Sequence, residues 1–321
     1  MRSKIKKTVI ITGYQCNNNC RFCLNSEKRG LPQKNTDKIR QELVLAKKRG
    51  NNFLELIGGE MTIRPDILDL ISFARGIGFE RITMATNGRM FSYLDFAKKI
   101  IEAGLNSVIF SIHGHNTKLH DGLTRASGSF EQLLEGINNF KKLKFKGVFG
   151  TNTTIVKQNY KYLPQIGKFI YNLGFNNSEF IFIDPNLGAP KYNFEKFVPR
   201  ISQTAPYIKR CLNIGIHYNI VKRGEPYRYD NNWSIRYVPL CYFQEYYPEQ
   251  ISEAREVDIY QNVEHLAPDF QDFDAIKGRQ EIGRIKPQKC LGCKLYKECE
   301  GIWREYIKHY GYSELKPIPK I

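Results

Sequence analysis

The strongest constraint on the fold is a regular alternation of strand-like and helix-like segments through the first two hundred residues. Short runs rich in Ile, Val, Phe and Thr predict strands, and each is followed by a segment whose apolar residues recur at helical spacing. The predicted strands are residues 8–14, 53–57, 81–86, 107–112, 148–156 and 179–183. The predicted helices are residues 37–49, 67–76, 93–103, 130–143, 163–173 and 194–209. Short connections imply parallel strands and right-handed crossovers, so we expect an α/β fold, a partial (β/α)6 TIM-like barrel, with an open doubly wound sheet as the alternative.

The alternation stops near residue 205, and the rest of the chain has a different pattern. Residues 214–220 and 233–238 predict an irregular β-hairpin, and residues 302–310 predict a short aromatic helix. Three of the eight cysteines lie between residues 290 and 299. We therefore expect a barrel domain over residues 1–205 and a small cysteine-rich C-terminal extension over residues 206–321 that packs against it.

Composition excludes some classes of protein. Of the 321 residues, 41% are hydrophobic and 25% are charged, which suits a folded globular chain. No apolar run approaches the ~18 residues that a membrane-spanning helix needs, and the N-terminal residues lack the apolar segment of a secretory signal. We expect a cytoplasmic protein with no membrane partner.

The formal net charge of the chain is +17, from 49 Lys and Arg against 32 Asp and Glu. Such an excess favours partners that carry phosphate or carboxylate groups. The basic residues are spread from end to end, however, and no basic block marks a nucleic-acid footprint. A solvated basic surface is therefore the alternative interpretation.

The cysteines fall into two groups, and in a cytoplasmic chain clustered thiols indicate ligation rather than disulfides. Cys16, Cys20 and Cys23 follow the first predicted strand, at the carboxyl end where βα enzymes build their sites. Three thiolates leave one coordination position open. Zinc would more often recruit a histidine, and none lies near this loop, so an iron–sulfur cubane with one unligated iron is the better match.

This cysteine spacing, with an aromatic residue before the third cysteine, resembles the signature of the radical S-adenosylmethionine (radical SAM) superfamily. The resemblance implies that Cys16, Cys20 and Cys23 hold a [4Fe-4S] cluster whose open iron is chelated by the amino and carboxylate groups of S-adenosylmethionine (SAM). It also implies that Phe22 lies beside the adenine of that cofactor.

Two further turns are similar to motifs of the same family. Gly58, Gly59 and Glu60 look like its GGE motif, in which backbone and carboxylate meet the amino group of the cofactor. A glycine pair permits close backbone approach, and a carboxylate suits an amine donor. Asn87, in a Thr-Asn-Gly turn after the third predicted strand, resembles another cofactor-binding position.

The region after the fourth predicted strand resembles relatives with peptide and cofactor-precursor substrates. The resemblance implies that Ser111 and Arg125 bind the cofactor carboxylate, and that Asn152 and residues 183–185 lie near its ribose and adenine. Three histidines crowd the same region, and we expect packing roles rather than metal ligation for them: His113, His115 and His120.

The second group of cysteines forms another metal-binding pattern. Cys290 and Cys293 make a knuckle in which Gly292 allows amides to point at the sulfurs, and Cys299 adds a third thiolate. The fourth ligand is either missing or is Cys241. Spacing alone leaves a four-cysteine zinc site and an iron–sulfur cluster as alternatives.

The family resemblance favours the cluster at this second site. Many radical SAM enzymes of similar length carry a shortened SPASM/Twitch-like domain with one auxiliary [4Fe-4S] cluster, which implies ligation by Cys241, Cys290, Cys293 and Cys299 here. The chain lacks the seven-cysteine pattern of the two-cluster extension. The remaining cysteine, Cys211, is expected to be a buried apolar residue.

The resemblance implies an enzyme that reductively cleaves SAM to a 5′-deoxyadenosyl radical, which then abstracts a hydrogen atom from substrate. It also implies an electron donor of the reduced flavodoxin or ferredoxin type. Post-translational modification of a peptide or protein is the first hypothesis for the reaction. Modification of a phosphate-bearing metabolite, another acidic small molecule or an RNA base is the second. Nucleic-acid binding by zinc knuckles is a hypothesis of a different class.

Overall fold

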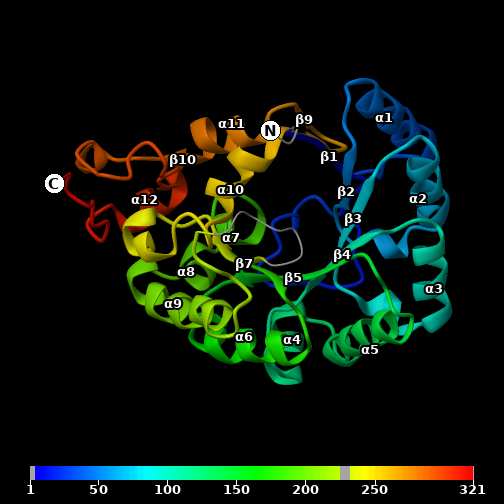
Figure 1. Ribbon diagram of the computed structural model, residues 1–321, viewed down its shortest axis with the longest axis horizontal. Coiled ribbons are helices and arrows are strands. Elements are labelled where there is room, and N and C mark those ends of the chain that lie inside the picture. The colour runs from blue at the N-terminus through cyan, green and yellow to red at the C-terminus, as the bar shows by residue number, and fades with distance from the viewer. Residues whose placement is uncertain (1–3, 225–231, 321) are drawn as a thin grey trace.

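The computed structural model describes residues 4–224 and 232–320 (Figure 1). These residues form a nine-stranded sheet with the strand order β7-β6-β5-β4-β3-β2-β1-β8-β9. Neighbouring strands in it are parallel, except that β9 runs antiparallel to β8. The strands are β1 (Ile5–Ile11), β2 (Phe53–Ile57), β3 (Arg81–Thr86), β4 (Ser107–Ser111), β5 (Val148–Ile155), β6 (Asn177–Phe182), β7 (Asn232–Arg236), β8 (Tyr260–Leu266) and β9 (Gln271–Asp272).

The first six strands confirm the predicted βα alternation and the parallel pairing that it implied. Strands β2 and β3 have the predicted bounds, whereas β1 begins three residues earlier than predicted. It begins early because Ile5 and Lys6 pair with Tyr260 and Asn262 of β8. That partner lies at the far end of the sequence, so no local pattern signals it.

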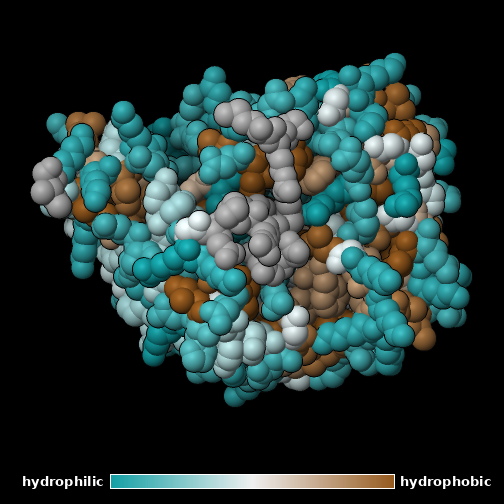
Figure 2. Space-filling view, in the orientation of Figure 1, coloured by the Kyte–Doolittle hydropathy of each residue, from teal (hydrophilic) through white to brown (hydrophobic). Residues whose placement is uncertain are grey.

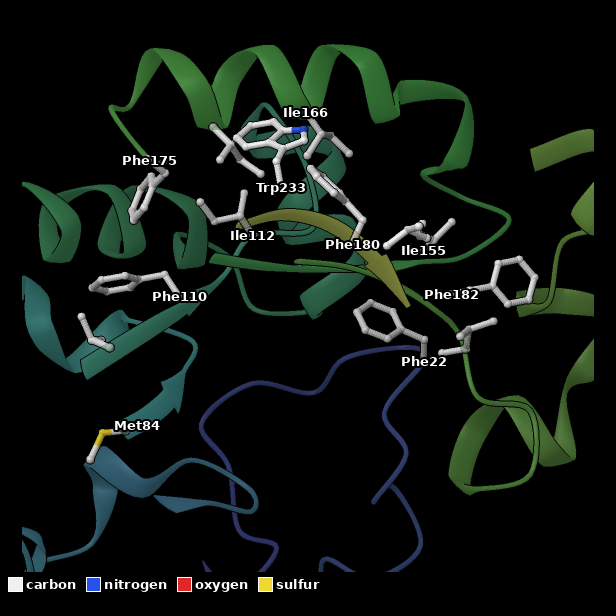
Figure 3. Close-up of a cluster of buried hydrophobic side chains, with 14 of the residues drawn as sticks. Phe22, Met84, Phe110, Ile112, Ile155, Ile166, Phe175, Phe180, Phe182 and Trp233 are labelled. Carbon is white, nitrogen blue, oxygen red and sulfur yellow. The ribbon is translucent and has the colours of Figure 1, made fainter. Parts of the chain in front are cut away.

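Helices cover the outer face of this curved sheet (Figure 1). They are α1 (Thr36–Lys48), α2 (Ile67–Gly76), α3 (Leu94–Glu102), α5 (Ser129–Lys142), α6 (Leu163–Asn172) and α9 (Ile201–His217). In β2, Leu54 and Leu56 are buried against this layer, whereas Glu55 on the inner face is half-buried. The main hydrophobic core therefore lies between strands and helices, and Figure 3 shows part of it around Phe110 and Trp233.

The predicted hairpin over residues 214–220 and 233–238 is wrong. Residues 214–217 belong to α9, and β7 pairs in parallel with β6, while residues 225–231 lie outside the described chain. The helix continues because Leu212 and Gly215 lie on its buried face, where a Cβ at Gly215 would come within 2.6 Å of the Trp233 ring. Trp233 also donates its indole N–H to the carbonyl oxygen of Cys211 at 2.9 Å, and Cys211 is buried as predicted.

The C-terminal part of the chain supplies strands at both ends of the barrel sheet. Strand β7 extends it beyond β6, and β8 extends it beyond β1. Among the described residues no pairing joins β7 to β8, so the ring is open there, and α10 (Ser252–Ile259) contacts both strands. The structure is thus a partial TIM-like barrel.

Shorter elements complete the described chain. The helix predicted over residues 194–209 is divided into α8 and α9, because Val198 and Arg200 have extended backbone. Helix α9 runs across residue 205, so a domain boundary at that point stays a prediction. The other elements are α4 (Thr117–Thr124), α7 (Gly188–Tyr192), α8 (Phe194–Phe197), α11 (Ala275–Gly278), β10 (Arg284–Ile285), β11 (Ile302–Trp303) and α12 (Arg304–Tyr310).

The aromatic C-terminal helix packs on the barrel as its spacing predicted. Tyr306 is fully buried and its hydroxyl accepts from the backbone N–H of Ile201 at 2.8 Å, while the Tyr310 hydroxyl donates to the carbonyl of Val198 at 2.9 Å. No helix among the described residues is long and apolar enough to span a bilayer. The face shown in Figure 2 is mainly hydrophilic, with scattered hydrophobic residues.

Candidate active site

The loop that carries the first three cysteines is fixed to the end of α4. The backbone N–H groups of Asn19 and Arg21 donate to the carbonyls of Thr124 and Leu123, both at 2.9 Å. The Arg21 side chain donates to the carbonyl of Gly122 at 2.7 Å. The last carbonyls of a helix have no partner within the helix, so the loop satisfies groups that would otherwise need water or a cap.

The other side of the loop rests on the start of α7. The backbone N–H of Ala189 donates to the carbonyl of Cys23 at 3.0 Å. Gly188 has a φ of +53° and leaves no room for a Cβ against the carbonyl of Leu24. The loop is therefore held between the segments that follow β4 and β6.

The three thiols of this loop are close enough to influence one another electrostatically. Burial raises the pKa of Cys20 to about 12, and the charges of Cys16 and Cys23 act in the same direction. Burial also raises the pKa of Cys16, to which the nearby Glu60 carboxylate adds. The backbone N–H of Asn18 donates to the Cys16 sulfur at 3.3 Å. Across the part of the chain that the structure describes, no three Cys, His, Asp or Glu side chains gather around a point suited to a single metal ion.

The two glycines after β2 bring the next turn against the cysteine loop. The backbone N–H of Gly59 donates to the carbonyl of Gly13 at 2.9 Å, and that of Glu60 donates to the carbonyl of Gln15 at 2.8 Å. A Cβ at Gly58 or Gly59 would overlap those carbonyl oxygens. The structure thus shows a close approach between the turn after β2 and the cysteine loop, and this approach explains why both positions are glycine.

Glu60 joins the turns that follow β2 and β3. Its Oε1 accepts from the hydroxyls of Thr62 and Thr86, both at 2.7 Å, and its Oε2 accepts from the backbone N–H of Asn87 at 2.7 Å. Burial raises the pKa of this carboxyl, and these hydrogen bonds oppose the rise. A carboxylate offers about four acceptor sites, so Oε2 retains capacity for one further donor.

Arg89, in the turn after β3, also contacts the cysteine loop, and the sequence did not predict this contact. Arg89 donates to the carbonyl of Asn17, to the Oδ1 of Asn18 at 3.0 Å and to the Oε1 of Gln132 at 2.6 Å. Its neighbour Asn87 donates to the Oδ1 of Asn17 at 2.7 Å. Arg89 therefore links the cysteine loop to α5. Its position directly after the Thr-Asn-Gly turn was the only sequence signal for it.

Phe22 is buried at the hydrophobic end of the loop. Figure 3 shows it among side chains from β5 and β6, and the edge of His113 lies against it, with ring centroids 4.9 Å apart. Burial lowers the pKa of His113 to about 3 and that of His120 to about 4. The backbone N–H of Thr154 donates to the Nδ1 of His113 at 3.3 Å. Both histidines are thus neutral packing residues, as predicted.

The other predicted cofactor-binding residues lie around the same end of the barrel. Ser111 ends β4 and pairs with Asn152 of β5. Arg125 follows α4 with a φ of +52° and is exposed. Asp184 follows β6, and its Oδ1 accepts from the side-chain amide of Asn186 at 2.7 Å. Their roles toward a cofactor stay predictions.

A cavity with polar and apolar walls lies inside the barrel, mainly toward the ends at which the strands begin. Lys7 of β1 forms an ion pair with Glu55 of β2. Arg236 of β7 contacts Glu256 of α10 at 2.6 Å and Glu179 of β6 at 3.5 Å. Asparagines, serines and threonines of the strands line much of the remaining wall, among them Thr83, Ser107, Thr151, Asn152, Asn177 and Asn232.

The second group of cysteines also converges. Cys241, Cys290, Cys293 and Cys299 line one pocket together with apolar side chains, among them Leu240, Leu295 and Leu315. Burial raises the pKa of Cys241 to about 11, and the charges of the other three thiols add to the rise. The structure therefore brings Cys241 to the three cysteines that follow it by about fifty residues or more.

Backbone N–H groups point at the sulfurs of this second site. Cys299 accepts from the N–H of Leu240 at 3.4 Å and from that of Gly301 at 3.3 Å. Cys293 accepts from the N–H of Ile318 at 3.4 Å. Such donors stabilise thiolate charge, which suits a cysteine-ligated centre.

Comparison with known proteins decides the family. The sequence matches the radical SAM superfamily over residues 10–170, half of the chain. The chain belongs to the radical SAM superfamily. It is therefore an enzyme of this superfamily, whose members bind a [4Fe-4S] cluster and SAM.

Relatives of this radical SAM enzyme have several activities. It is 30% identical over 161 residues to the "AdoMet-dependent heme synthase" of Methanosarcina barkeri, which covers 50% of this chain and 45% of that protein. It is 28% identical over 181 residues to the "Probable GTP 3',8-cyclase" of Sulfurisphaera tokodaii, which covers 56% of each chain. The chain spans about half the length of the curated relatives that it matches.

Solved structures resemble almost the whole chain in fold. The enzyme anSMEcpe with bound AdoMet has a TM-score of 0.66 at 13% identity, covering 98% of this chain and 93% of that chain. Streptococcus suis SuiB bound to the precursor peptide SuiA has a TM-score of 0.61 at 16% identity, covering 96% and 73%. This similarity extends beyond the barrel to the segment that carries the second cysteine site.

The residues of the first site fit the group that the radical SAM family binds. The donor set is three thiols on a loop held at both sides, with an amide N–H directed at one sulfur. Burial raises the pKa of Cys16 and Cys20 and so favours their protonated forms in the metal-free chain, whereas a bound cluster requires thiolates. The positive charges of Arg89 and Arg29 lie beside the loop, since both side chains hydrogen-bond to Asn18, and they favour the thiolate form.

Proposed function

We propose that this radical SAM enzyme modifies a peptide or protein substrate, with one [4Fe-4S] cluster on Cys16, Cys20 and Cys23 and an auxiliary [4Fe-4S] cluster at the second cysteine site. The observation that carries the proposal is the barrel cavity, whose wall combines ion-paired side chains with amides, hydroxyls and apolar groups. A barrel domain over residues 1–205 and an auxiliary domain over residues 206–321 form part of the same proposal.

Several of the charges that line the cavity are engaged with one another, and Arg81 and Arg255 also lie in its wall. Lys7 contacts Glu55, and Arg236 contacts Glu179 and Glu256. The described lining has four basic and three acidic side chains, a surplus of one, whereas a triphosphate would favour a larger surplus of positive charge. Amides and hydroxyls between these charges match a peptide backbone, which offers both donors and acceptors along its length.

The whole-chain structural neighbours support a peptide substrate. SuiB is described in complex with a precursor peptide, and anSMEcpe with AdoMet and a peptide. The similarity to both includes the segment after the barrel, whereas the sequence relatives match about half of this chain.

The proposed residue roles follow the resemblance to the radical SAM family. Cys16, Cys20 and Cys23 would hold the cluster, while Gly58, Gly59 and the free acceptor site on Glu60 would position the cofactor amino group. Ser111 and Arg125 would bind its carboxylate, and Phe22, Asn87 and Asn152 would line its nucleoside. When bound, cluster and cofactor supply one-electron cleavage of the sulfonium bond and hydrogen-atom abstraction.

The chain's own residues hold the reactants in place and keep other hydrogen donors away. The hydrogen bonds of the cysteine loop to α4 and α7 fix the position of the thiols relative to the cavity. Orientation of this kind matters because a carbon radical has little intrinsic selectivity. A reduced flavodoxin or ferredoxin-type partner would supply the electron, and eight cysteines without disulfides fit a cytoplasmic location.

A small-molecule substrate is the second candidate. The sequence relatives named heme synthase and GTP cyclase favour it, because they share 28–30% identity through the barrel. An acidic or phosphate-bearing compound would also suit the net charge of +17.

The test uses anaerobically reconstituted protein reduced with dithionite in the presence of SAM. We expect about eight irons per chain if both centres are cubanes, and release of 5′-deoxyadenosine measured by chromatography. Cys16→Ala should abolish that release, whereas Cys293→Ala should retain at least part of it. Release that survives the loss of Cys16 would contradict the assignment, and zinc in place of iron would favour the nucleic-acid hypothesis.

The substrate class is tested with the same preparation. Short peptides encoded beside the gene are compared with GTP and an iron porphyrin as added substrates. The proposal expects a peptide to stimulate 5′-deoxyadenosine release and to change in mass. Stimulation by GTP or the porphyrin alone would instead support the second candidate.

A further inference from the structure

Among the described residues, a buried guanidinium beside the second cysteine site has a single carboxylate within 4.0 Å. Arg284 of β10 is 1% exposed, and its Nη2 donates to the carbonyl of Gly301 at 2.6 Å. Its nearest carboxylate in the structure, on Glu253, is 3.9 Å from Nη1. The Nε and Nη1 atoms have no hydrogen-bond partner among the described residues.

The same residue is connected to the sulfur of Cys299. The carbonyl oxygen of Gly301 accepts a hydrogen bond from Arg284, and its backbone N–H donates a hydrogen bond to the Cys299 sulfur. Burial raises the pKa of the Cys299 thiol, and the charge of Arg284 acts against that rise. The positive charge of Arg284 therefore acts on the Cys299 sulfur both through space and through the hydrogen bonds of Gly301.

The packing around Arg284 holds the charge in place. The guanidinium lies over the Trp303 ring, 4.8 Å from its centroid, and 6.0 Å from that of Tyr237. β10 pairs with β11, where Arg284 is directly opposite Trp303. Aromatic faces stabilise a cation but do not neutralise it as a carboxylate would.

We propose that Arg284 sets the reduction potential of the second cysteine site, by keeping an incompletely neutralised positive charge next to Cys299. This inference rests on the proposed auxiliary cluster. The potential of an iron–sulfur centre depends on local charge, hydrogen bonds to sulfur and exposure to solvent. A fixed cation favours the more negative, reduced state of such a centre, and low exposure limits screening of that cation.

The proposal also accounts for the neighbouring carboxyl. Glu253 of α10 accepts a hydrogen bond from the backbone N–H of Tyr237 with one oxygen, and its other oxygen is buried with no hydrogen-bond partner in the described part of the chain. Burial raises the pKa of Glu253 to about 7, which the charge of Glu300 reinforces and those of Arg284, Arg236 and Arg279 oppose. Glu253 is therefore the opposing charge, and its removal should have the opposite effect.

The test measures a potential rather than turnover. The full-length Cys16→Ala/Cys20→Ala/Cys23→Ala variant removes the first site, so that EPR-monitored redox titration follows the second cluster alone. In this background Arg284→Gln should lower the reduction potential by at least ~59 mV, which corresponds to a tenfold change in the one-electron equilibrium constant. Arg284→Lys retains the charge and should restore most of the shift.

Matched controls separate charge from structure. Arg304→Gln removes the same formal charge from an exposed position on α12 and should leave the potential unchanged. Glu253→Gln, measured at about pH 8.5 where the carboxyl is ionised, should shift the potential upward. An unchanged potential in Arg284→Gln, or a downward shift in Glu253→Gln, would overturn the inference.

The two proposals fail in different ways. A triple-cysteine variant that binds zinc, or binds no iron under reconstitution, would refute the auxiliary cluster itself. An iron-loaded variant whose potential ignores Arg284 and Glu253 would refute only the present inference. If Arg284→Gln does not load iron, the upward shift in Glu253→Gln still decides the matter.

Discussion

Replacement of Gly59 by alanine tests whether the turn after β2 holds the cysteine loop. A Cβ at this position would overlap the carbonyl oxygen of Gln15, which is backbone and cannot rotate away. The two loops must therefore separate, and the hydrogen bonds from Gly59 to Gly13 and from Glu60 to Gln15 are lost or lengthened.

The expected cost follows from those two bonds. Each buried backbone group left without a partner costs about 1–3 kcal/mol, so Gly59→Ala should lower the free energy of unfolding by about 2–5 kcal/mol. For a chain of this size, that corresponds to a fall in Tm of roughly 4–15 °C. The variant should also bind less iron at the first site, because the loop carrying Cys16 starts at this contact.

The assay is urea and thermal unfolding of the reduced, metal-free chain, with iron analysis after reconstitution. Gly76→Ala is the matched control, since it lies at the end of α2 and a Cβ there meets nothing within 4 Å. That change should leave stability equal or raise it by about 0.5–1 kcal/mol. Equal stability of Gly59→Ala and wild type would refute the argument, as would an equal loss in Gly76→Ala.

Other predictions concern single contacts. Cys241→Ser should lower the iron of the second site, whereas Cys211→Ser should retain full iron, as measured by metal analysis of each purified variant. Arg89→Ala should release the cysteine loop from α5 and lower iron at the first site while Cys241-bound iron persists, as Mössbauer or EPR quantification would show. The pKa of His113 is about 3 because of burial, below its unfolded value, so its contribution to stability is present above about pH 6.5 and is lost as pH falls toward 3. His113→Phe should therefore weaken the dependence of unfolding free energy on pH in that range, and an unchanged slope would contradict the assignment.

The sequence predicted the elements whose signals are local. Strands β2 and β3 and helix α2 have the predicted bounds, because each combines a short periodic pattern with glycine or proline near its ends. Burial of Cys211 was also predicted from its isolation on a helix.

Features formed by segments that are distant in sequence could not be predicted from local patterns. Strands β7 and β8 each pair with a strand far away in sequence. The residues around them therefore showed no pattern that distinguishes parallel pairing from a hairpin. The link from Arg89 to the cysteine loop and the contact of the Thr86 hydroxyl with Glu60 likewise depend on neighbouring strand ends. Motif spacing can name the residues of one loop, but it does not reveal which other loops complete their hydrogen bonds.

A chain of ion-paired side chains leads from the barrel cavity toward the second cysteine site. Glu179 and Arg236 face the cavity, Arg236 contacts Glu256, and Arg279 contacts both Glu256 and Glu300, each at 2.8 Å. Glu300 directly follows Cys299, and on α10 Glu253 lies three residues from Glu256, on the same helical face. Loss of the Arg236–Glu256 contact would therefore alter the electrostatic field near Glu300 and Cys299. The ionic chain thus joins β7, the strand next to the opening, to the segment that carries Cys299.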